Sequence, residues 1–307
     1  RRENYFPSSA DWRNEVLYFL LPDRFSDGKE DTRPLLNRQQ LNQARPNLPN
    51  GQSWGFDKWA KSGGDRWQGG TLKGLESKLD YLNQLGVTTI WVGPIFLQRG
   101  HLDSYHGYGI QDFLEVDPRF GTRQDLVSLV NKAHKKGLRI ILDIIFNHSG
   151  SNWIYAPGTP GGVWEPPYTS GWYQFGSWLG EQGQLIAGKP QTSEEGVWPI
   201  ELQEPDCYTR AGKGDLGRGD LDDPNAEFRR SDFISLRDFQ LDYPHLLDNL
   251  ARCYKYWIAL TDCDGFRIDT LKHVSYDQAR NFCGAIKEFA ANLGKSDFFL
   301  VAEVAGG

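Results

Sequence analysis

The sequence predicts an α/β fold with a parallel sheet whose two faces are covered by helices. Three observations lead to this prediction. Short runs rich in Ile, Val and Leu recur along the chain, helical patterns separate them, and glycines follow several of the helical patterns as stop signals. Near-continuous apolar strands are typical of parallel sheets, and right-handed helical crossovers connect such strands.

The first part of the chain alternates strand, helix, strand, helix and strand. Residues 16–21, 88–92 and 139–146 are the apolar runs that we expect to form strands. A helix is predicted over 72–85, where leucines recur at helical spacing before Gly86. A second helix is predicted over 123–136, because its apolar residues share one face and Gly137 follows.

The alternation stops between residues 149 and 230, where Gly, Pro, Trp and Asp dominate and no long amphipathic helix can be drawn. A structureless loop of this length is improbable in a compact domain, so an inserted subdomain is expected after the third strand. The alternation then resumes, with helices over 243–260 and 276–293 that lead into strands at 265–268 and 298–302. The predicted organisation is a first part over 1–148 with strands one to three, an inserted domain over 149–232, and a second part over 233–307 with strands four and five.

Composition limits the partners of the chain. Its 307 residues carry a net charge of −6, and no basic stretch of five or more residues occurs, which argues against binding to nucleic acid or to an anionic membrane. No apolar run approaches the roughly 18 residues of a membrane span, and the N-terminal residues lack the apolar core of a signal peptide. A mature secreted form and a cytoplasmic protein are both consistent with this sequence.

The four cysteines have no C-x-x-C spacing, and we expect them to be buried free thiols.

Two of the predicted strands end in a carboxylate, Asp269 and Glu303. The carboxyl ends of parallel strands meet at one edge, and paired carboxylates at such an edge can cleave a glycosidic bond. Arg267 and Asp269 share a face of their strand, so Arg267 is expected to lower the pKa of Asp269, as suits a nucleophile. Burial beside Val301 and Ala302 is expected to raise the pKa of Glu303, as suits a general acid. The alternative is a structural Arg–Asp pair that holds two strands together.

A further polar set lies at the end of the third strand, in Asp143, Asn147 and His148. Asn147 and Asp238 offer the hard oxygen ligands that calcium prefers, whereas a turn or helix cap is the alternative role for Asn147. His106 lies in a Gly-rich loop that is able to reach a ligand, and a surface loop position is its alternative.

These residues fall in ordered blocks that resemble the α-amylase family of retaining glycoside hydrolases. The blocks are residues 106–108 with 116–122, 143–148, 265–273 and 301–303, and the resemblance runs from about residue 14 to the end. It implies a (β/α)8 TIM barrel of which this chain holds about the first five β/α units. The family's third catalytic Asp, which lies in an Asn-His-Asp block after a later strand, has no counterpart here. We therefore expect the remainder of the barrel and any C-terminal domain to lie beyond Gly307, and the piece to be inactive alone.

The resemblance also implies roles for individual residues. Asp269 is implied as the nucleophile, Glu303 as the acid and base, and Arg267 as the group that orients Asp269. The substrate-binding set that it implies is His106, Tyr108, Asp143, His148, Lys272 and His273. Within that set the two histidines 106 and 148 donate to sugar hydroxyls, Tyr108 is the platform beneath the sugar, and Lys272 and His273 contact the leaving-group side. The implied calcium ligands are Asn147, Asp238 and the carbonyl of His273, although Arg237 and Phe239 replace the family's usual neighbours of that Asp.

The expected function is hydrolysis of α-1,4-glucosidic bonds in starch and malto-oligosaccharides, with retention through a covalent glycosyl-enzyme. An α-glucan oligosaccharide or polysaccharide is therefore the expected partner, and calcium is the expected cofactor. Two alternatives stay open, namely an α-glucan transglycosylase with the same residues and a non-catalytic barrel that binds carbohydrate or serves a transporter. Many tryptophans lie in the Gly-rich segments, where flat rings offer contact area to sugars or pack a subdomain that is poor in regular structure.

Overall fold

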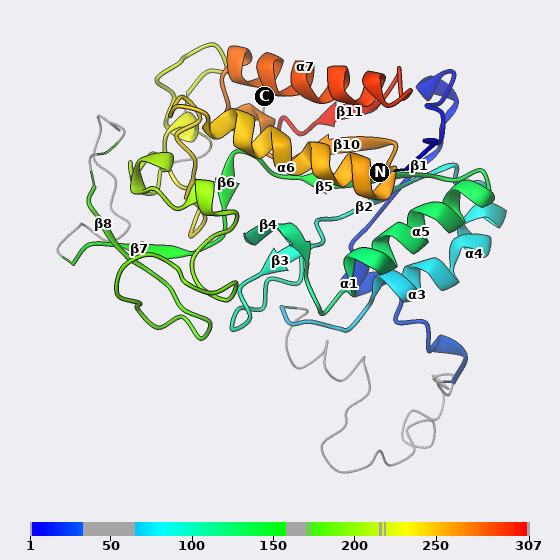
Figure 1. Ribbon diagram of the computed structural model, residues 1–307, viewed down its shortest axis with the longest axis horizontal. Helices are drawn as coiled ribbons and strands as arrows, with labels where there is room; N and C mark the ends of the chain where they lie inside the picture. Colours follow the sequence, from blue (N-terminus) through cyan, green and yellow to red (C-terminus); the bar gives the residue numbers. More distant parts are fainter. Residues whose placement is uncertain are drawn as a thin grey trace.

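A computed structural model of the chain describes residues 2–32, 65–157, 171, 173–214, 217 and 219–305. Its centre is a parallel sheet of five strands in the order β1-β2-β5-β10-β11 (Figure 1). The strands are β1 (Leu17–Leu20), β2 (Thr89–Val92), β5 (Arg139–Ile144), β10 (Gly265–Ile268) and β11 (Phe299–Ala302). Each strand pairs with the next one of this set along the chain, which confirms the predicted α/β class and the five predicted strands.

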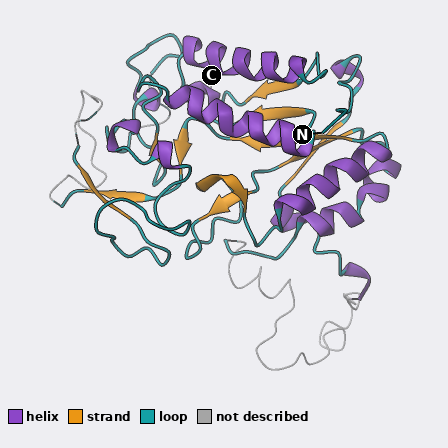
Figure 2. Cartoon of the chain, viewed as in Figure 1, coloured by secondary structure: helices purple, strands orange, loops and turns teal. Residues whose placement is uncertain are grey.

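Helices connect these strands and run beside them (Figure 2). They are α1 (Pro22–Phe25), α3 (Leu72–Ser77), α4 (Leu79–Gln84), α5 (Arg123–Lys135), α6 (Leu246–Thr261) and α7 (Tyr276–Asn292). Helix α5 packs against α3 and α6, and α6 packs against α7. None of the helices in the described residues is long and apolar enough to cross a membrane.

Two of the long helices begin with side-chain caps that the sequence encodes. Ahead of α5 the side chain of Thr122 accepts a hydrogen bond from the backbone N–H of Asp125, and the carboxylate of Asp125 accepts one from the backbone N–H of Thr122, which forms a capping box. Ser275 and Gln278 form the same box ahead of α7. Gly137 follows α5 with φ +75°, a conformation that glycine adopts without steric cost. The strand that follows α5 is thus placed by a helix with defined ends.

Three boundaries differ from the prediction. The helix predicted over 72–85 is two helices, because Lys78 leaves helical geometry at φ −106° and ψ 8°. Helix α6 begins at Leu246 rather than 243, since His245 before it has a left-handed backbone with φ 65°. An antiparallel hairpin of β3 (Phe96–Gln98) and β4 (Ile110–Val116) lies between β2 and α5, and the sequence did not predict it.

The segment between β5 and α6 contains short antiparallel pairs and 3-10 turns. Its strands are β6 (His148–Ser149), β7 (Trp153–Tyr155), β8 (Phe175–Trp178) and β9 (Arg237–Asp238). Strand β7 pairs with β8 and β6 pairs with β9, while none of the described residues of this segment forms an α-helix. The 3-10 turns that the structure describes in this segment are η3 (Ile200–Leu202), η4 (Pro205–Cys207) and η5 (Glu227–Arg229). Elsewhere in the described residues lie η1 (Trp12–Asn14), η2 (Glu30–Thr32) and η6 (Leu271–His273). The predicted interruption of the α/β alternation is therefore present, whereas the division into domains stays a prediction.

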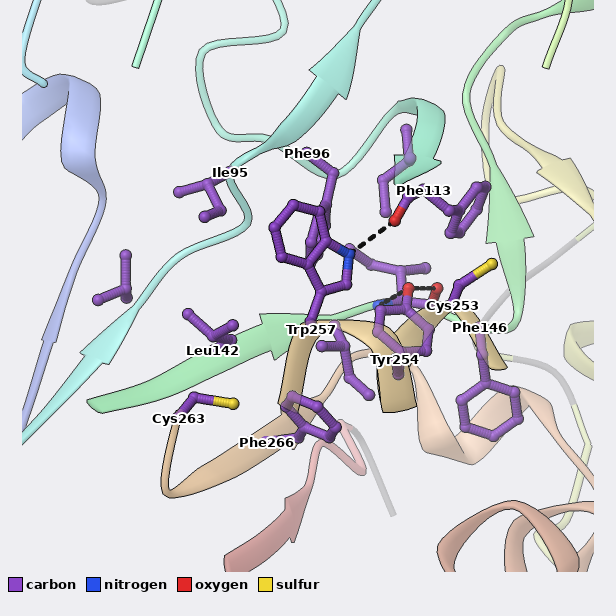
Figure 3. Close-up of a cluster of buried hydrophobic side chains, with 14 of the residues drawn as sticks. Ile95, Phe96, Phe113, Leu142, Phe146, Cys253, Tyr254, Trp257, Cys263 and Phe266 are labelled. Carbon is purple, nitrogen blue, oxygen red and sulfur yellow. Dashed lines mark hydrogen bonds between the residues drawn. The ribbon is translucent and has the colours of Figure 1, made fainter. Parts of the chain in front are cut away.

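A buried apolar cluster joins side chains of α6 to Leu142 of β5 and Phe266 of β10 (Figure 3). Trp257 and Tyr254 of α6 are fully buried in it. The indole N–H of Trp257 donates to the Phe113 carbonyl at 2.7 Å, and the Tyr254 hydroxyl donates to the carbonyl of Ile145. All four cysteines are free thiols, as predicted, and all but Cys283 are fully buried.

Candidate active site

Arg267 lies at the centre of a group of three carboxylates. The register of β10 and β5 places it directly opposite Asp143. Its Nη1 donates to Oδ1 of Asp143 at 2.9 Å and to Oδ1 of Asp269 at 2.6 Å, and its Nη2 lies 3.0 Å from Oε2 of Glu303. One buried guanidinium therefore binds side chains that come from β5, from the end of β10 and from the end of β11.

Asp269 is buried, with 6% of its surface exposed. Burial raises its pKa to about 6, the positive charge of Arg267 opposes this rise, and the nearby Glu303 adds to it. The lowered pKa that the sequence predicted is therefore wrong. The physical reason is that Arg267 divides its charge among three carboxylates, so that it does not outweigh the loss of solvation. A pKa of about 6 still leaves Asp269 mostly ionised at neutral pH.

The side chain of Glu303 is more exposed than the sequence predicted. Its side chain is 36% exposed, so the predicted burial is wrong. The apolar neighbours in sequence do not cover it, because β11 is an edge strand of the described sheet and Ala302 and Val304 beside it are exposed. The backbone N–H of Thr270 donates to Oε2 of Glu303 at 3.0 Å and fixes the carboxylate next to Arg267.

Asp143 lies beneath this pair and is 1% exposed. Its Oδ2 accepts from the indole N–H of Trp91 at 2.9 Å and from the hydroxyl of Tyr108 at 3.1 Å. Burial raises the pKa of Asp143 to about 7 against the opposing charge of Arg267. Trp91 was not among the predicted site residues, because within an apolar strand an indole is indistinguishable from a core side chain.

His106 and Tyr108 form one wall of the site. Their rings are nearly parallel, with centroids 5.7 Å apart, and Nδ1 of His106 accepts from the backbone N–H of Tyr108 at 3.1 Å. Burial, assisted by the charge of Arg24, lowers the pKa of His106. A neutral ring whose Nδ1 accepts carries its proton on Nε2, so His106 presents a donor.

His148 lies close to Asp269. Its Nδ1 is 3.1 Å from Oδ1 of Asn147, and its Nε2 is 4.0 Å from Oδ2 of Asp269. Burial, with a smaller contribution from His273, lowers the pKa of His148 to about 3, so the ring is neutral at pH 7. Its Nε2 has no hydrogen-bond partner in the part of the chain that the structure describes.

Lys272 and His273 lie on η6, directly after the strand that carries Arg267. Both are nearly buried, at 8% and 7% exposure. Nδ1 of His273 lies 2.6 Å from the carbonyl of Phe228, and the Lys272 ammonium lies 4.8 Å from the centroid of the Phe228 ring. Phe228 thus orients both side chains.

A cavity of about 590 Å³ brings most of the predicted residues together. Those that line it are His106, Tyr108, His148, Arg267, Asp269, Lys272, His273 and Glu303. Phe233 and Ile234 also line it and were not predicted, because they lie in a segment without regular structure. Ile234 is 61% exposed and has a left-handed backbone with φ 58°, which is unusual for a β-branched residue.

The predicted calcium ligands lie beside the cavity. Strands β6 and β9 pair His148 with Asp238, and Nδ2 of Asn147 is 3.4 Å from Oδ2 of Asp238. Asp238 is fully buried, and its Oδ1 has no hydrogen-bond partner among the described residues. No group of three or more His, Cys, Asp or Glu side chains within these residues is arranged to hold a metal ion. A site here therefore needs amide or carbonyl oxygens besides the carboxylate of Asp238.

The tryptophans that were considered as sugar platforms have different outcomes. Trp153 and Trp178 are buried and pack against other aromatic rings, and the indole N–H of Trp198 donates to the carbonyl of Glu195. Trp153 and Trp178 therefore serve packing, and hydrogen bonds hold Trp198 in its own loop. Trp67 packs against Phe120, with the guanidinium of Arg119 over its ring. Trp54, Trp59, Trp164 and Trp172 lie outside the described residues.

The chain is similar to known proteins over most of its length. A family model described as the catalytic domain of alpha amylase matches residues 19–289. An alpha-amylase of Streptomyces lividans is 32% identical over 262 residues, which cover 78% of this chain and 28% of that protein. The chain thus spans less than a third of that relative.

The fold of the chain also matches solved structures. An alpha-amylase from Geobacillus thermoleovorans, complexed with acarbose, matches with a TM-score of 0.59 and 27% identity over 97% of this chain and 48% of that one. CldA, a cyclomaltodextrin glucanotransferase, shares the fold with a TM-score of 0.59 at 24% identity, over 89% of this chain and 48% of its own. Both a hydrolase and a transferase therefore have this arrangement of strands and helices.

Proposed function

Because the chain belongs to the alpha-amylase family, we propose that the protein containing it hydrolyses α-1,4-glucosidic bonds of starch and malto-oligosaccharides with retention of configuration. The observation that carries this proposal is the contact of one guanidinium, that of Arg267, with both Asp269 and Glu303 at the cavity. Both carboxylates line the cavity, and two carboxyl groups that flank a glycosidic bond are the minimum that double displacement requires.

Asp269 is the nucleophile in this proposal and Glu303 the acid and base. Asp269, ionised at neutral pH, attacks the anomeric carbon while Glu303 protonates the departing glycosidic oxygen. The covalent glycosyl-enzyme is then hydrolysed by a water whose proton Glu303 accepts. The bond from the backbone N–H of Thr270 and the contact with Arg267 hold the carboxylate of Glu303 in place for this double role.

The substrate contacts follow from the tautomers and positions of the surrounding side chains. Nε2–H of His106 is a donor for a sugar hydroxyl, and the ring of Tyr108 beside it is a platform for the sugar face. The neutral His148 offers a further polar contact near Asp269. Lys272 and His273 lie on the side that we assign to the leaving group.

Transglycosylation by the same residues is the second candidate. The glycosyl-enzyme reacts with whichever nucleophile reaches it, and the exposed Ile234 at the cavity gives a second sugar an apolar surface. We retain hydrolysis as the proposed activity because the Streptomyces lividans relative is named an alpha-amylase.

We also propose a structural calcium ion held by Asn147, Asp238 and the carbonyl of His273. The buried Oδ1 of Asp238, which has no hydrogen-bond partner among the described residues, supports this assignment. A cation there would neutralise a carboxylate that is otherwise expensive to bury. The ion would brace the end of β6 next to His148, and no catalytic step depends on it.

The test uses the full protein that contains this chain and malto-oligosaccharides of defined length. Asp269→Asn is expected to lower kcat by at least about 1,000-fold, whereas Asp277→Asn, an exposed carboxylate on α7, keeps full activity. Proton NMR of the first products is expected to show the α-anomer. Activity of Asp269→Asn on starch at the wild-type level, or a β-anomer as first product, would refute the proposal. Products longer than the substrate would favour the transferase.

A further inference from the structure

Trp91 contacts two members of the catalytic group although it is not among the described residues that line the cavity. Its indole N–H donates to Oδ2 of Asp143 at 2.9 Å. The guanidinium carbon of Arg267 lies 5.2 Å from the centroid of its ring. One side chain from β2 therefore touches both the carboxylate beneath the site and the cation at its centre.

The register of the sheet explains this position. Trp91 pairs with Ile141 of β5, and Asp143 follows two residues later on the same face of that strand. Asp143 in turn pairs with Arg267 of β10. Side chains of three adjacent strands thus lie next to one another in a row. On its other side the ring of Trp91 contacts Phe19 of β1, with centroids 4.3 Å apart, which limits its movement.

We propose that Trp91 is a positioning residue for the reaction proposed above: its N–H favours the ionised form of Asp143, and that carboxylate shares Arg267 with Asp269 and Glu303. This inference rests on the proposed function. Strand β2 thus contributes to the chemistry through Trp91, although Trp91 is not among the described residues that line the cavity.

The hydrogen-bonding capacity of the groups accounts for this role. An indole N–H is only ever a donor, so it stabilises an oxygen that accepts and favours the ionised carboxylate. Asp143 is almost fully buried and has little solvent to replace such a donor. Without the N–H, Asp143 takes up a proton at higher pH. Arg267 then loses one of its three counter-charges and binds Asp269 and Glu303 more tightly, which withdraws both from the sugar.

The other groups that face Asp143 do not replace this donor. Arg267 and Asp269 of β10 act with opposite signs, and Tyr108 already donates to the same Oδ2. Tyr254 of α6 binds the backbone of Ile145 instead. Trp91 is thus the donor whose loss changes the charge of Asp143 without removing a group that touches the sugar.

The first experiment measures kcat/KM against pH for the full protein and for Trp91→Phe, which keeps a ring but lacks the N–H. In Trp91→Phe the acidic limb of the profile of kcat/KM against pH is expected to move up by about one pH unit. Its kcat/KM is then about 10-fold below that of wild type at pH 6 and within about twofold of it at pH 8.5. Phe19→Leu, which alters the contact with the same ring and no polar atom, is expected to leave the limb in place. A loss that is equal at every pH, or no loss, would overturn the inference.

Asp269→Asn separates this inference from the function on which it rests. If that variant is inactive and Trp91→Phe has the wild-type profile, only the role of Trp91 fails. If Asp269→Asn is active, the proposed function itself fails.

A second measurement does not depend on activity or on the folding of the Trp91 variant. In ¹H–¹⁵N spectra of the wild-type protein, one indole N–H resonance is expected to shift with the titration of Asp143, and in Asp143→Asn that resonance is expected to stay constant with pH. Absence of any titrating indole resonance in the wild type would contradict the inference.

Discussion

Arg267 and Asp143 face each other across two adjacent parallel strands, and Nη1 of Arg267 donates to Oδ1 of Asp143 at 2.9 Å. The same Nη1 donates to Oδ1 of Asp269 at 2.6 Å. Two carboxylates therefore share one nitrogen of a guanidinium whose other terminal nitrogen binds Glu303. The planar, forked shape of the guanidinium is what allows this sharing, because it holds its donors in fixed directions.

Arg267→Lys is expected to keep the charge and lose this geometry. A single ammonium cannot bind three carboxylates from three strands at once, so Asp269 and Glu303 lose their fixed relation. We expect kcat to fall at least about 100-fold while KM changes much less, as measured by steady-state kinetics on a malto-oligosaccharide. Arg280→Lys, on the exposed face of α7, is the matched control and is expected to behave as wild type. A lysine variant with wild-type kcat would show that charge alone suffices.

The pKa values of Asp143 and Asp269 predict how stability depends on pH. Both are raised in the folded protein, to about 7 and about 6, so the folded state binds protons more tightly than the unfolded chain does. Their contribution to stability is present at about pH 4 and is lost as pH rises towards 7. For Asp143 the loss is at most on the order of 4 kcal/mol.

The measurement compares the melting temperatures of wild type and Asp143→Asn between pH 4.5 and pH 8. The advantage of wild type over the variant is expected to shrink as pH rises, since only wild type loses the stability that is linked to Asp143. A difference that is constant across this range would mean that Asp143 does not have a raised pKa in the folded protein.

Much of the fold and part of the site could be predicted because the relevant patterns are local. The five strands are continuous apolar runs, and α5 and α7 have both periodic apolar faces and capping residues. Strand parity alone places Arg267 and Asp269 on one face. The hairpin of β3 and β4 was missed because its pairing depends on contacts between segments and shows no strict alternation of apolar and polar residues.

The electrostatics of the site could not be predicted from neighbours in sequence. Glu303 follows apolar residues yet is partly exposed, because its strand lies at the edge of the described sheet. Asp269 is next to one Arg in the sequence, but in the fold it shares that Arg with Asp143 and Glu303. Both errors have the same cause, namely that burial and charge are set by strands that are distant in the sequence.

A buried ion cluster at the opposite end of β10 predicts a large effect on stability. The side chain of Lys295 has no solvent exposure, and its Nζ lies 2.6 Å from Oδ1 of Asp262 and 3.3 Å from Oδ1 of Asp264. It also donates to the carbonyl of Phe6 at 2.8 Å. Lys295→Met leaves two buried carboxylates without this cation and is expected to lower the free energy of unfolding by about 3 to 5 kcal/mol.

Urea unfolding provides the measurement for Lys295→Met, with an unchanged slope as the sign that the same structure unfolds. Lys287→Met on the exposed face of α7 is the control and should cost less than about 0.5 kcal/mol. Equal unfolding midpoints for the two variants would show that the pair of aspartates does not need Lys295.

Calcium removal tests the metal site that we propose at Asp238. A bound ion would contact the buried Oδ1 of Asp238, for which the described residues provide no hydrogen-bond partner. Its removal leaves a buried carboxylate unpaired, so a chelator is expected to lower the melting temperature of the protein, and added Ca²⁺ to restore it in proportion to the logarithm of its concentration. Asp238→Asn is expected to melt at the same temperature with and without Ca²⁺, while Asp242→Asn, an exposed carboxylate nearby in sequence, keeps the full response. A wild-type melting temperature that neither chelator nor Ca²⁺ changes would exclude a structural calcium at this position.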